Sequence, residues 1–170
     1  MNYILLTMSL PKRKTYLLLG SNIGKSEKNL EKAKKYIEKS IGKIIRSSSV
    51  YTSQAWGKKD QPDFLNQVLI VNNHLTPSET IQTILSIEEK MGRVRKQKNE
   101  PRIIDIDILF YDKEIINTAN LTVPHPLIQE RNFVLRPLNE LSPKFIHPIL
   151  KKSVHTLLNS CKDPLAVEKK

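Results

Sequence analysis

The sequence predicts an α+β domain with a mainly antiparallel sheet, and two observations support this fold class. Short apolar or β-branched runs and amphipathic segments follow one another in the order strand, helix, strand, strand, helix, strand. The 170 residues contain no internal repeat, low-complexity segment or linker, which indicates one domain. This order of elements is that of the ferredoxin-like α/β sandwich, here extended by helices near the C-terminus.

The first four elements occupy residues 15–75. Their expected positions are a buried strand at 15–20 (TYLLLG), a helix from an N-cap at Ser26 to about Ser40, and strands at 44–56 and 64–75. The helix is amphipathic, because Leu30, Ala33 and Ile37 recur on one face and lysines lie opposite. A loop with turn-forming residues, 57–63, separates the two strands.

The second helix has the clearest end signals in the sequence. Thr76 is a favourable N-cap, Pro77 suits the first helical position, and Glu79 can close a capping box. The helix should reach Met91, with Gly92 as the glycine that ends it.

The buried face of this second helix should consist of Ile81, Ile84 and Leu85, which recur at helical spacing. Glu88 falls on the same face. A carboxylate at that position is either a boundary residue or points into a site near the end of the helix.

The remaining elements are a strand at 103–110 and helices at 133–141 and 154–161. Residues 14–162 are expected to form the single domain, preceded by a disordered leader at 1–13 and followed by a basic tail at 163–170. Met8 is a candidate start residue within the leader.

Composition restricts the function classes. A net charge of +11 and a pI near 9.7 indicate an anionic partner, such as a nucleotide, a nucleic acid or a membrane surface. Only 6% of the residues are aromatic, which is poor for base stacking. Cys161 is the single cysteine, so there is neither a disulfide framework nor zinc spacing, and a reducing cytoplasm is the simplest setting. We expect a monomer that binds small molecules, with no nucleic-acid or membrane partner.

One stretch, residues 92–110, combines many cations with two carboxylates. Its cationic residues are Arg93, Arg95, Lys96, Lys98 and Arg102. Asp105 and Asp107 follow two residues apart, so they share one face of the predicted strand. Mg2+ takes one or two carboxylates and leaves its other positions to water and phosphate, and arginines bind the same phosphates. The alternative is a solvated acidic strand face paired to surface arginines.

A second stretch, Gly20 to Ser26 (GSNIGKS), resembles a Walker A loop between a strand and a helix. That loop needs four residues between its first glycine and the Gly-Lys pair, whereas three separate Gly20 from Gly24 here. A P-loop kinase also needs a parallel sheet, which the order of elements does not predict. It remains the second candidate, since it too would use ATP and Mg2+.

Five separated pieces of the sequence resemble one enzyme family in order and spacing. They are LLLGSN at 17–22, DQPDFLNQV at 60–68, GRVR at 92–95, PRIIDIDIL at 101–109 and LTVPHPLIQERNFVLRPL at 121–138. Together they resemble 6-hydroxymethyl-7,8-dihydropterin pyrophosphokinase of folate biosynthesis, over roughly residues 15–160. The resemblance implies the ferredoxin-like fold and the transfer of pyrophosphate from ATP to the pterin's hydroxymethyl group, with release of AMP.

The resemblance also implies roles for individual residues at the ATP end. Asp105 and Asp107 match a pair that binds two Mg2+ ions, and either could accept the hydroxyl proton. Arg93, Arg95 and Arg102 match arginines that stabilise charge on the transferred group. Further ATP contacts are implied for Lys96, Lys98, Ile108, His125 and Arg131. Asn99 and Glu100 stand where many members have Trp-Gly, so the closure of this loop should differ here.

The implied pterin-binding residues are Gly20, Ser53, Gln54, Trp56, Phe64, Asn66 and Phe133. Phe64 and Phe133 would enclose the flat heterocycle, and Asn66 would offer it a donor and an acceptor. The two phenylalanines could instead be ordinary core residues. A ferredoxin-like nucleic-acid-binding module is the non-enzymatic alternative, but it gives no reason for the two aspartates.

Overall fold

The computed structural model describes residues 12–56, 60–93 and 100–170, and an antiparallel sheet is its centre. The main sheet contains β1 (Arg13–Ser21), β2 (Gly42–Ser47), β3 (Tyr51–Ser53), β4 (Phe64–Asn73), β5 (Asp105–Tyr111) and β8 (Val167–Lys169). The strand order is β5-β1-β4-β3-β8, and β2 pairs with the other end of β4. Every pairing is antiparallel, as the sequence predicts.

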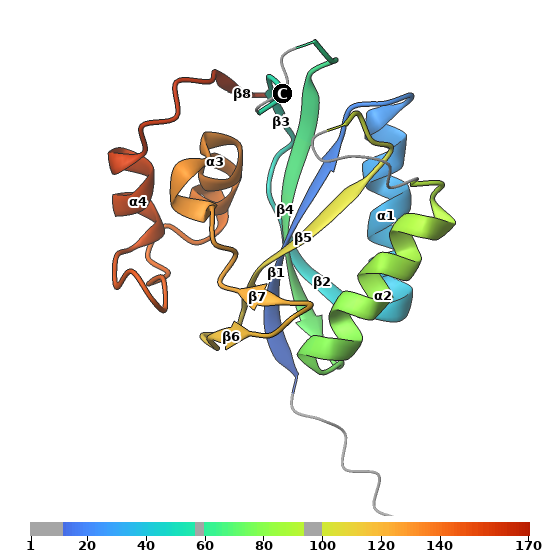
Figure 1. The fold of residues 1–170 in the computed structure, drawn as a ribbon, viewed down its shortest axis with the longest axis horizontal. Helices are drawn as coiled ribbons and strands as arrows, with labels where there is room; N and C mark the ends of the chain where they lie inside the picture. Colours follow the sequence, from blue (N-terminus) through green and yellow to red (C-terminus); the bar gives the residue numbers. More distant parts are fainter. Residues whose placement is uncertain (1–11, 57–59, 94–99) are drawn as a thin grey trace, which may run out of the picture.

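Helices cover both faces of this sheet (Figure 1). On one side lie α1 (Ser26–Ser40) and α2 (Pro77–Lys90), and on the other α3 (Asn132–Leu141) and α4 (Val154–Ser160). A hairpin of β6 (Ile116–Asn117) and β7 (Thr122–Val123) and a 3-10 turn, η1 (Ile128–Glu130), connect β5 to α3. The predicted order of elements is confirmed.

The two covered faces explain the continuous apolar run in β1. Leu17 and Leu19 pack against α1 and α2, whereas Tyr16 and Leu18 pack against α3 and α4. Because side chains alternate along a strand, a strand buried on both faces needs apolar residues at every position. An exposed sheet face, on which a nucleic-acid-binding module would stack bases, is therefore absent from the described sheet.

The predicted ends of α2 are confirmed. Thr76 is the N-cap, and its side chain and that of Glu79 form the capping box around Pro77. Gly92 follows the helix with a φ of 89°, a conformation that favours glycine. The prediction for α1 is wrong by one residue, since the N-cap position is Lys25 and Ser26 is already helical.

The buried face of α2 differs from the prediction at two positions. Leu85 is 41% exposed and Ile81 is only partly buried, whereas the buried positions are Thr80, Ile84, Ile87 and Glu88. Helix periodicity allows either set, because neighbouring positions on a helix differ by only part of a turn. The Glu88 side of α2 is the buried one, because Glu88 accepts a hydrogen bond from the Ile106 N–H of the edge strand β5.

Residues 44–56, expected as one strand, form two. β2 and β3 pair with opposite ends of β4, and Ser48 lies between them. The Ser48 hydroxyl oxygen accepts the Val68 N–H at 3.0 Å, and the buried Gln67 side chain donates to the Ser48 carbonyl at 2.7 Å. These side-chain hydrogen bonds add to one backbone bond at the break, in which the Ser48 N–H donates to the Val68 carbonyl at 2.9 Å.

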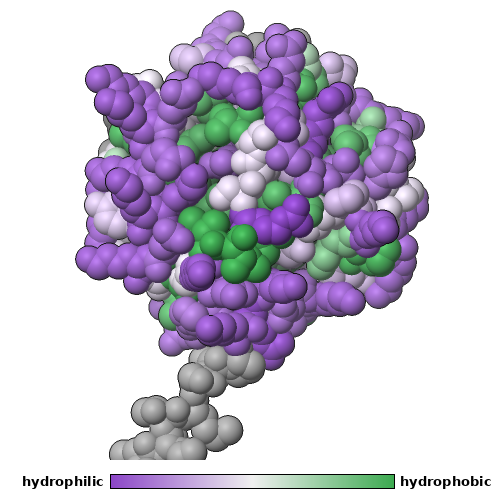
Figure 2. All heavy atoms as spheres, turned by 180° about the vertical axis from the view of Figure 1, so that it is seen from behind, coloured by the Kyte–Doolittle hydropathy of each residue, from purple (hydrophilic) through white to green (hydrophobic). Residues whose placement is uncertain are grey.

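The last residues of the chain join the sheet. Residues 163–170, expected as a basic tail outside the domain, contain β8, which pairs with β3. The face opposite that of Figure 1 is mostly hydrophilic, with hydrophobic residues in separate patches (Figure 2). Within the described ranges, every helix is too short or too polar to cross a membrane.

Candidate active site

A cavity of about 750 Å3 lies at the β5 edge of the sheet and brings most of the predicted site residues together. From the predicted sets, its lining includes Gly20, Ser53, Gln54, Trp56, Phe64, Asn66, Arg93, Arg102, Asp105, Asp107, His125, Arg131 and Phe133. Ile108 is the exception, because its side chain is buried in the core facing α1 and α2. Arg95, Lys96 and Lys98 lie outside the described residues.

Asp105 stands between two arginines at the first position of β5. The Arg93 guanidinium donates to one carboxylate oxygen at 2.6 Å, and the Arg102 guanidinium donates to the other at 2.6 Å. Burial opposes the charge of Arg93, but attraction from Asp105 and Glu88 raises the pKa of this arginine. Two arginine side chains that precede β5 are thus held at the first position of that strand.

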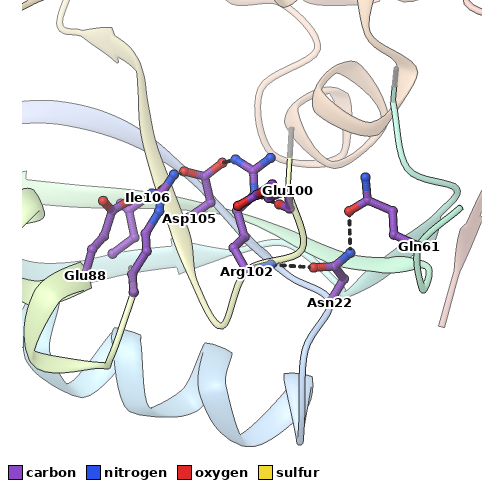
Figure 3. Close-up of polar contacts among 8 residues, drawn as sticks. Asn22, Gln61, Glu88, Glu100, Arg102, Asp105 and Ile106 are labelled. Carbon is purple, nitrogen blue, oxygen red and sulfur yellow. Dashed lines mark hydrogen bonds and ion pairs between the residues drawn. The ribbon is translucent and has the colours of Figure 1, made fainter. Parts of the chain in front are cut away.

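Glu88 resolves the alternative that the sequence left open, since it points into the site (Figure 3). Its side chain is buried and pairs with Arg93, and one carboxylate oxygen accepts the Ile106 N–H at 2.8 Å. Glu88 therefore ties the end of α2 to the edge strand β5 and orients Arg93 toward Asp105.

Asp107 has different surroundings. Among the described residues it makes no hydrogen bond or ion pair, and its carboxylate lies deep in the cavity. Burial, together with the nearby charges of Asp105 and Glu88, raises the pKa of Asp107 to about 7, although Arg131 and Arg102 oppose the shift. A cation at this carboxylate would remove the cause of the shift.

The pair therefore fits a hard divalent cation by its donor chemistry. Two carboxylates face the same cavity, and the described residues contain no cluster of three or more acidic, histidine or cysteine side chains that could enclose a metal. Mg2+ suits such an open site, because it keeps water and phosphate oxygens in its remaining positions.

His125 and Arg131 line the cavity beside Asp107. The Arg131 guanidinium lies 4.5 Å from the Trp56 ring and 5.7 Å from the Phe133 ring, and its buried Nε has no partner among the described residues. Burial lowers the pKa of this arginine. Burial and the Arg131 charge lower the pKa of His125 to about 4, so the imidazole is neutral. An anion beside Arg131 would satisfy its buried charge.

Aromatic and amide side chains form the other end of the cavity. Phe64 faces the Arg102 guanidinium at 5.6 Å, and no ring contact joins it to Phe133 in the described structure. Asn66 is buried, and its Nδ2 donates to the Ser53 hydroxyl at 2.9 Å. Its Oδ1 accepts no hydrogen bond within the described ranges. Gly20 lies opposite, and a side chain there would contact Asn66, Phe64 and Asp105.

Asn22 supports the site from behind the cavity lining by holding Arg102, and the sequence prediction missed it. Its Oδ1 accepts the Arg102 N–H at 2.8 Å, and its Nδ2 donates to Gln61 and to the Pro62 carbonyl at 3.1 and 3.0 Å (Figure 3). Asn22 thus joins β1 to the loops before β4 and before β5. Asn22 is the last residue of the LLLGSN segment, and that segment was the sequence signal that could have identified it.

Two other walls were also missed. They are the outer side of α2 and the tip of the β6–β7 hairpin, which contribute Ser78, Ile81, Gln82, Leu85, Ala119 and Asn120. Leu85 lines the cavity, which accounts for its exposure. These residues belong to no recognised sequence motif. They are identified only by the tertiary structure, which places α2 and the hairpin beside the cavity.

The sequence model of the 7,8-dihydro-6-hydroxymethylpterin-pyrophosphokinase (HPPK) family matches residues 16–143. The chain belongs to this family. A 2-amino-4-hydroxy-6-hydroxymethyldihydropteridine pyrophosphokinase from Aquifex aeolicus is 44% identical over 137 residues, which are 81% of this chain and 85% of the relative. One of the same name from Synechocystis is 40% identical over 141 residues, 82% of this chain and 72% of the relative.

Longer proteins contain an HPPK-like part. The folic acid synthesis protein fol1 of Pneumocystis carinii is 39% identical over 154 residues, which are 90% of this chain but 21% of fol1. Among solved structures, a Plasmodium falciparum HPPK-DHPS triple mutant with STZ-DHP has a TM-score of 0.74 and 20% identity, over 93% of this chain and 45% of that one. This chain therefore spans less than half of that solved chain, and the likeness confirms the fold.

The family and the sheet together decide between the alternatives. Gly20 lies within β1, and the described main sheet has only antiparallel pairs. The P-loop hypothesis, which needs a parallel sheet with the loop at a strand end, is therefore not supported. The nucleic-acid-binding alternative is not supported either, because helices cover both sheet faces.

Proposed function

We propose that this HPPK-family chain transfers the pyrophosphoryl group of ATP to the hydroxymethyl oxygen of 6-hydroxymethyl-7,8-dihydropterin, in folate biosynthesis. The hydroxyl oxygen forms a bond to the β-phosphorus of ATP. The bond between this phosphorus and the oxygen shared with the α-phosphate breaks, and AMP leaves with that oxygen. The hydroxyl proton passes to a carboxylate of the site or to water.

One observation carries this proposal. Asp105 and Asp107 lie in a single cavity whose lining combines arginines with aromatic and amide side chains. The cavity thus offers a place for polyphosphate next to a place for a flat heterocycle with hydrogen-bonding edges. Ile81 and Leu85 on α2 add an apolar wall that suits the nucleoside part of ATP.

Asp105 and Asp107 would hold two Mg2+ ions, which when bound would neutralise phosphate charge and activate the hydroxyl group. The chain's own residues have separate tasks. Arg93 and Arg102 balance the charge of the transferred group, and Arg131 supplies a third buried cation.

At the acceptor end, Phe64 and Phe133 would enclose the pterin. Asn66 would accept a hydrogen bond from its edge through the Oδ1 that no described residue occupies. Ser53 fixes the Asn66 amide and so determines which of its groups faces the ligand. Gln54 and Trp56 complete this wall.

The test is to incubate the protein with ATP, MgCl2 and 6-hydroxymethyl-7,8-dihydropterin and to identify the nucleotide product by chromatography. We expect AMP and pterin diphosphate in equal amounts, and none of either without MgCl2. ADP as the product would mean transfer of a single phosphoryl group and would contradict the proposal.

A further inference from the structure

The C-terminal segment, residues 162–170, runs from α4 back to the main sheet (Figure 1). It lies beyond residue 143, where the match to the family's sequence model ends. The segment nevertheless contacts two elements that carry acceptor-side residues of the cavity, α3 and β3.

Its first contact is at the start of α3. The Asp163 carboxylate accepts the Asn132 N–H at 2.9 Å, and the Asp163 carbonyl accepts from the Asn132 side chain at 2.7 Å. The first N–H groups of a helix lack intrahelical partners, and α3 has no side-chain cap of its own. Asp163 therefore caps α3, and Asn132 lies between two cavity residues, Arg131 and Phe133.

Its second contact is with β3. Val167 pairs with Ser53, and Lys169 pairs with Tyr51. On the opposite side of β3, Ser53 pairs with Phe64 of β4. Val167 is buried, so this pairing also excludes water from the sheet edge. Without β8, β3 would be a three-residue edge strand with one partner.

Further polar contacts fix the same junction. The Lys170 N–H donates to the Val50 carbonyl at 2.9 Å. Glu140 of α3 accepts from the Tyr51 hydroxyl at 2.6 Å, and Lys169 lies 3.5 Å from the same carboxylate. The segment, α3 and β3 are therefore mutually connected, beside the pocket that contains Ser53 and Phe133.

We propose that the C-terminal segment is a positioning element for the acceptor end of the cavity. It holds the α3 wall, with Phe133, and the β3 wall, with Ser53, in a fixed relation, and it thereby sets the affinity for the pterin. This inference rests on the proposed function. Arg93 and Arg102 at the ATP end are anchored separately, through Glu88 and Asn22, so that among the described residues Arg131 is the one ATP-side residue beside the segment's contacts.

A deletion of residues 166–170 removes the β3 contact, and Asp163→Ala removes the cap of α3. Glu168→Ala is the matched control, because Glu168 is an exposed β8 residue whose side chain makes no hydrogen bond or ion pair within the described ranges. KM and kcat are measured for each substrate by AMP formation. Pterin affinity is measured independently by calorimetry with an unreactive ATP analogue, and folding by thermal denaturation.

For the deletion we expect KM and Kd for the pterin to rise on the order of tenfold, while KM for ATP changes less than about twofold, since a 1 Å misplacement can cost up to about 10²-fold. Asp163→Ala should raise the pterin KM about threefold, as expected for one lost hydrogen bond. Glu168→Ala should match the unaltered chain.

Equal changes for both substrates would show a purely structural role and overturn the inference. So would an unchanged pterin KM in a folded deletion variant. If the deletion variant does not fold, Asp163→Ala decides: an unchanged pterin KM and Kd overturns the inference. Absence of AMP formation by the unaltered chain would instead refute the proposed function.

Discussion

Around Asp105 the chain supplies its own counter-charges, whereas none of the described residues contacts the Asp107 carboxylate with a hydrogen bond or ion pair. Arg93 and Arg102 each donate to the Asp105 carboxylate at 2.6 Å, and Glu88 holds Arg93 in place. Asp107, two residues further along the same strand face, has no such partner among the described residues, and its pKa is raised to about 7.

Two identical side chains on one strand face therefore have different surroundings, and we propose that Asp105 also has a structural task that Asp107 lacks. Asp105 is part of an ion-pair network that positions the arginines and gives stability. Asp107 destabilises the folded state when it is ionised, because burial and like charges oppose its carboxylate. A carboxylate with a strongly raised pKa in a cavity is a candidate functional group. For Asp107, metal binding is the function that fits. The predictions below test this division.

Asp107→Ala should have the largest effect on activity. We expect kcat to fall by about 10³-fold or more, because the main unpaired carboxylate of the site is lost. The thermal midpoint should stay unchanged or rise, since a buried repelled charge is removed. AMP formation and thermal denaturation measure the two. Near-normal AMP production by a folded Asp107→Ala chain would exclude the metal-site assignment.

Asp105→Ala should lower both activity and stability, in contrast to Asp107→Ala. It leaves Arg93 and Arg102 without their shared partner, and breaking a buried ion pair costs about 3 kcal/mol. We expect kcat to fall by about 10²-fold because the arginines lose their orientation. Chemical denaturation gives the free energy of unfolding. Equal free energies of unfolding for Asp105→Ala and Asp107→Ala would contradict the proposal that Asp105 stabilises the fold and Asp107 does not.

The pH dependence of stability should carry the signature of Asp107. Its pKa is about 7 in the folded state and near 3.8 when unfolded, so the folded state holds an extra proton between these values. The Asp107 contribution to stability is therefore present below about pH 4 and is lost as the pH rises through about 7. His125, whose pKa falls from 6.5 to about 4, has the opposite effect between those two values.

Comparing the unaltered chain with Asp107→Asn separates the contribution of Asp107 to the pH dependence of stability from that of the other titrating groups. In EDTA, the thermal midpoint of the unaltered chain should fall relative to that of the variant as the pH rises from 4 to 7. Added Mg2+ should reduce the difference at pH 7, because the cation replaces the proton. Parallel pH profiles in EDTA would mean that Asp107 is solvated rather than repelled.

Lys25→Ala should have the smallest effect. Lys25 is the N-cap residue of α1 and makes no side-chain cap, and it lies outside the cavity lining. We expect kcat and KM for ATP to change by less than about twofold, as for a surface substitution. Complete loss of nucleotide binding would restore the P-loop hypothesis that the antiparallel sheet argues against.

Some of the site was predictable because its signals are local in sequence. Strand periodicity places Asp105 and Asp107 on one face, whereas the pterin-side residues were predicted through the motifs that resemble the family. The capping box at Thr76 was predictable for the same reason, since it needs only four consecutive residues.

Other features depend on contacts between distant parts of the chain. The side of α2 that faces the core could not be chosen from periodicity, so Leu85 was misplaced and Glu88 stayed undecided. The two terminal lysines of residues 163–170 suggested a tail, although backbone pairing with β3 is available to almost any sequence. Main-chain hydrogen bonding leaves little trace in composition.

By itself, the sequence determined the α+β order of elements, the chemical groups of the site and the family resemblance. It could do so because hydrophobic periodicity and motif spacing are properties of neighbouring residues. The tertiary structure alone decided that Asp105 is paired while Asp107 has no partner within residues 12–56, 60–93 and 100–170, and that β8 extends the sheet beside Ser53. Charge environments and strand partners arise only when residues far apart in sequence are brought together, and the same is true of the cavity that combines them.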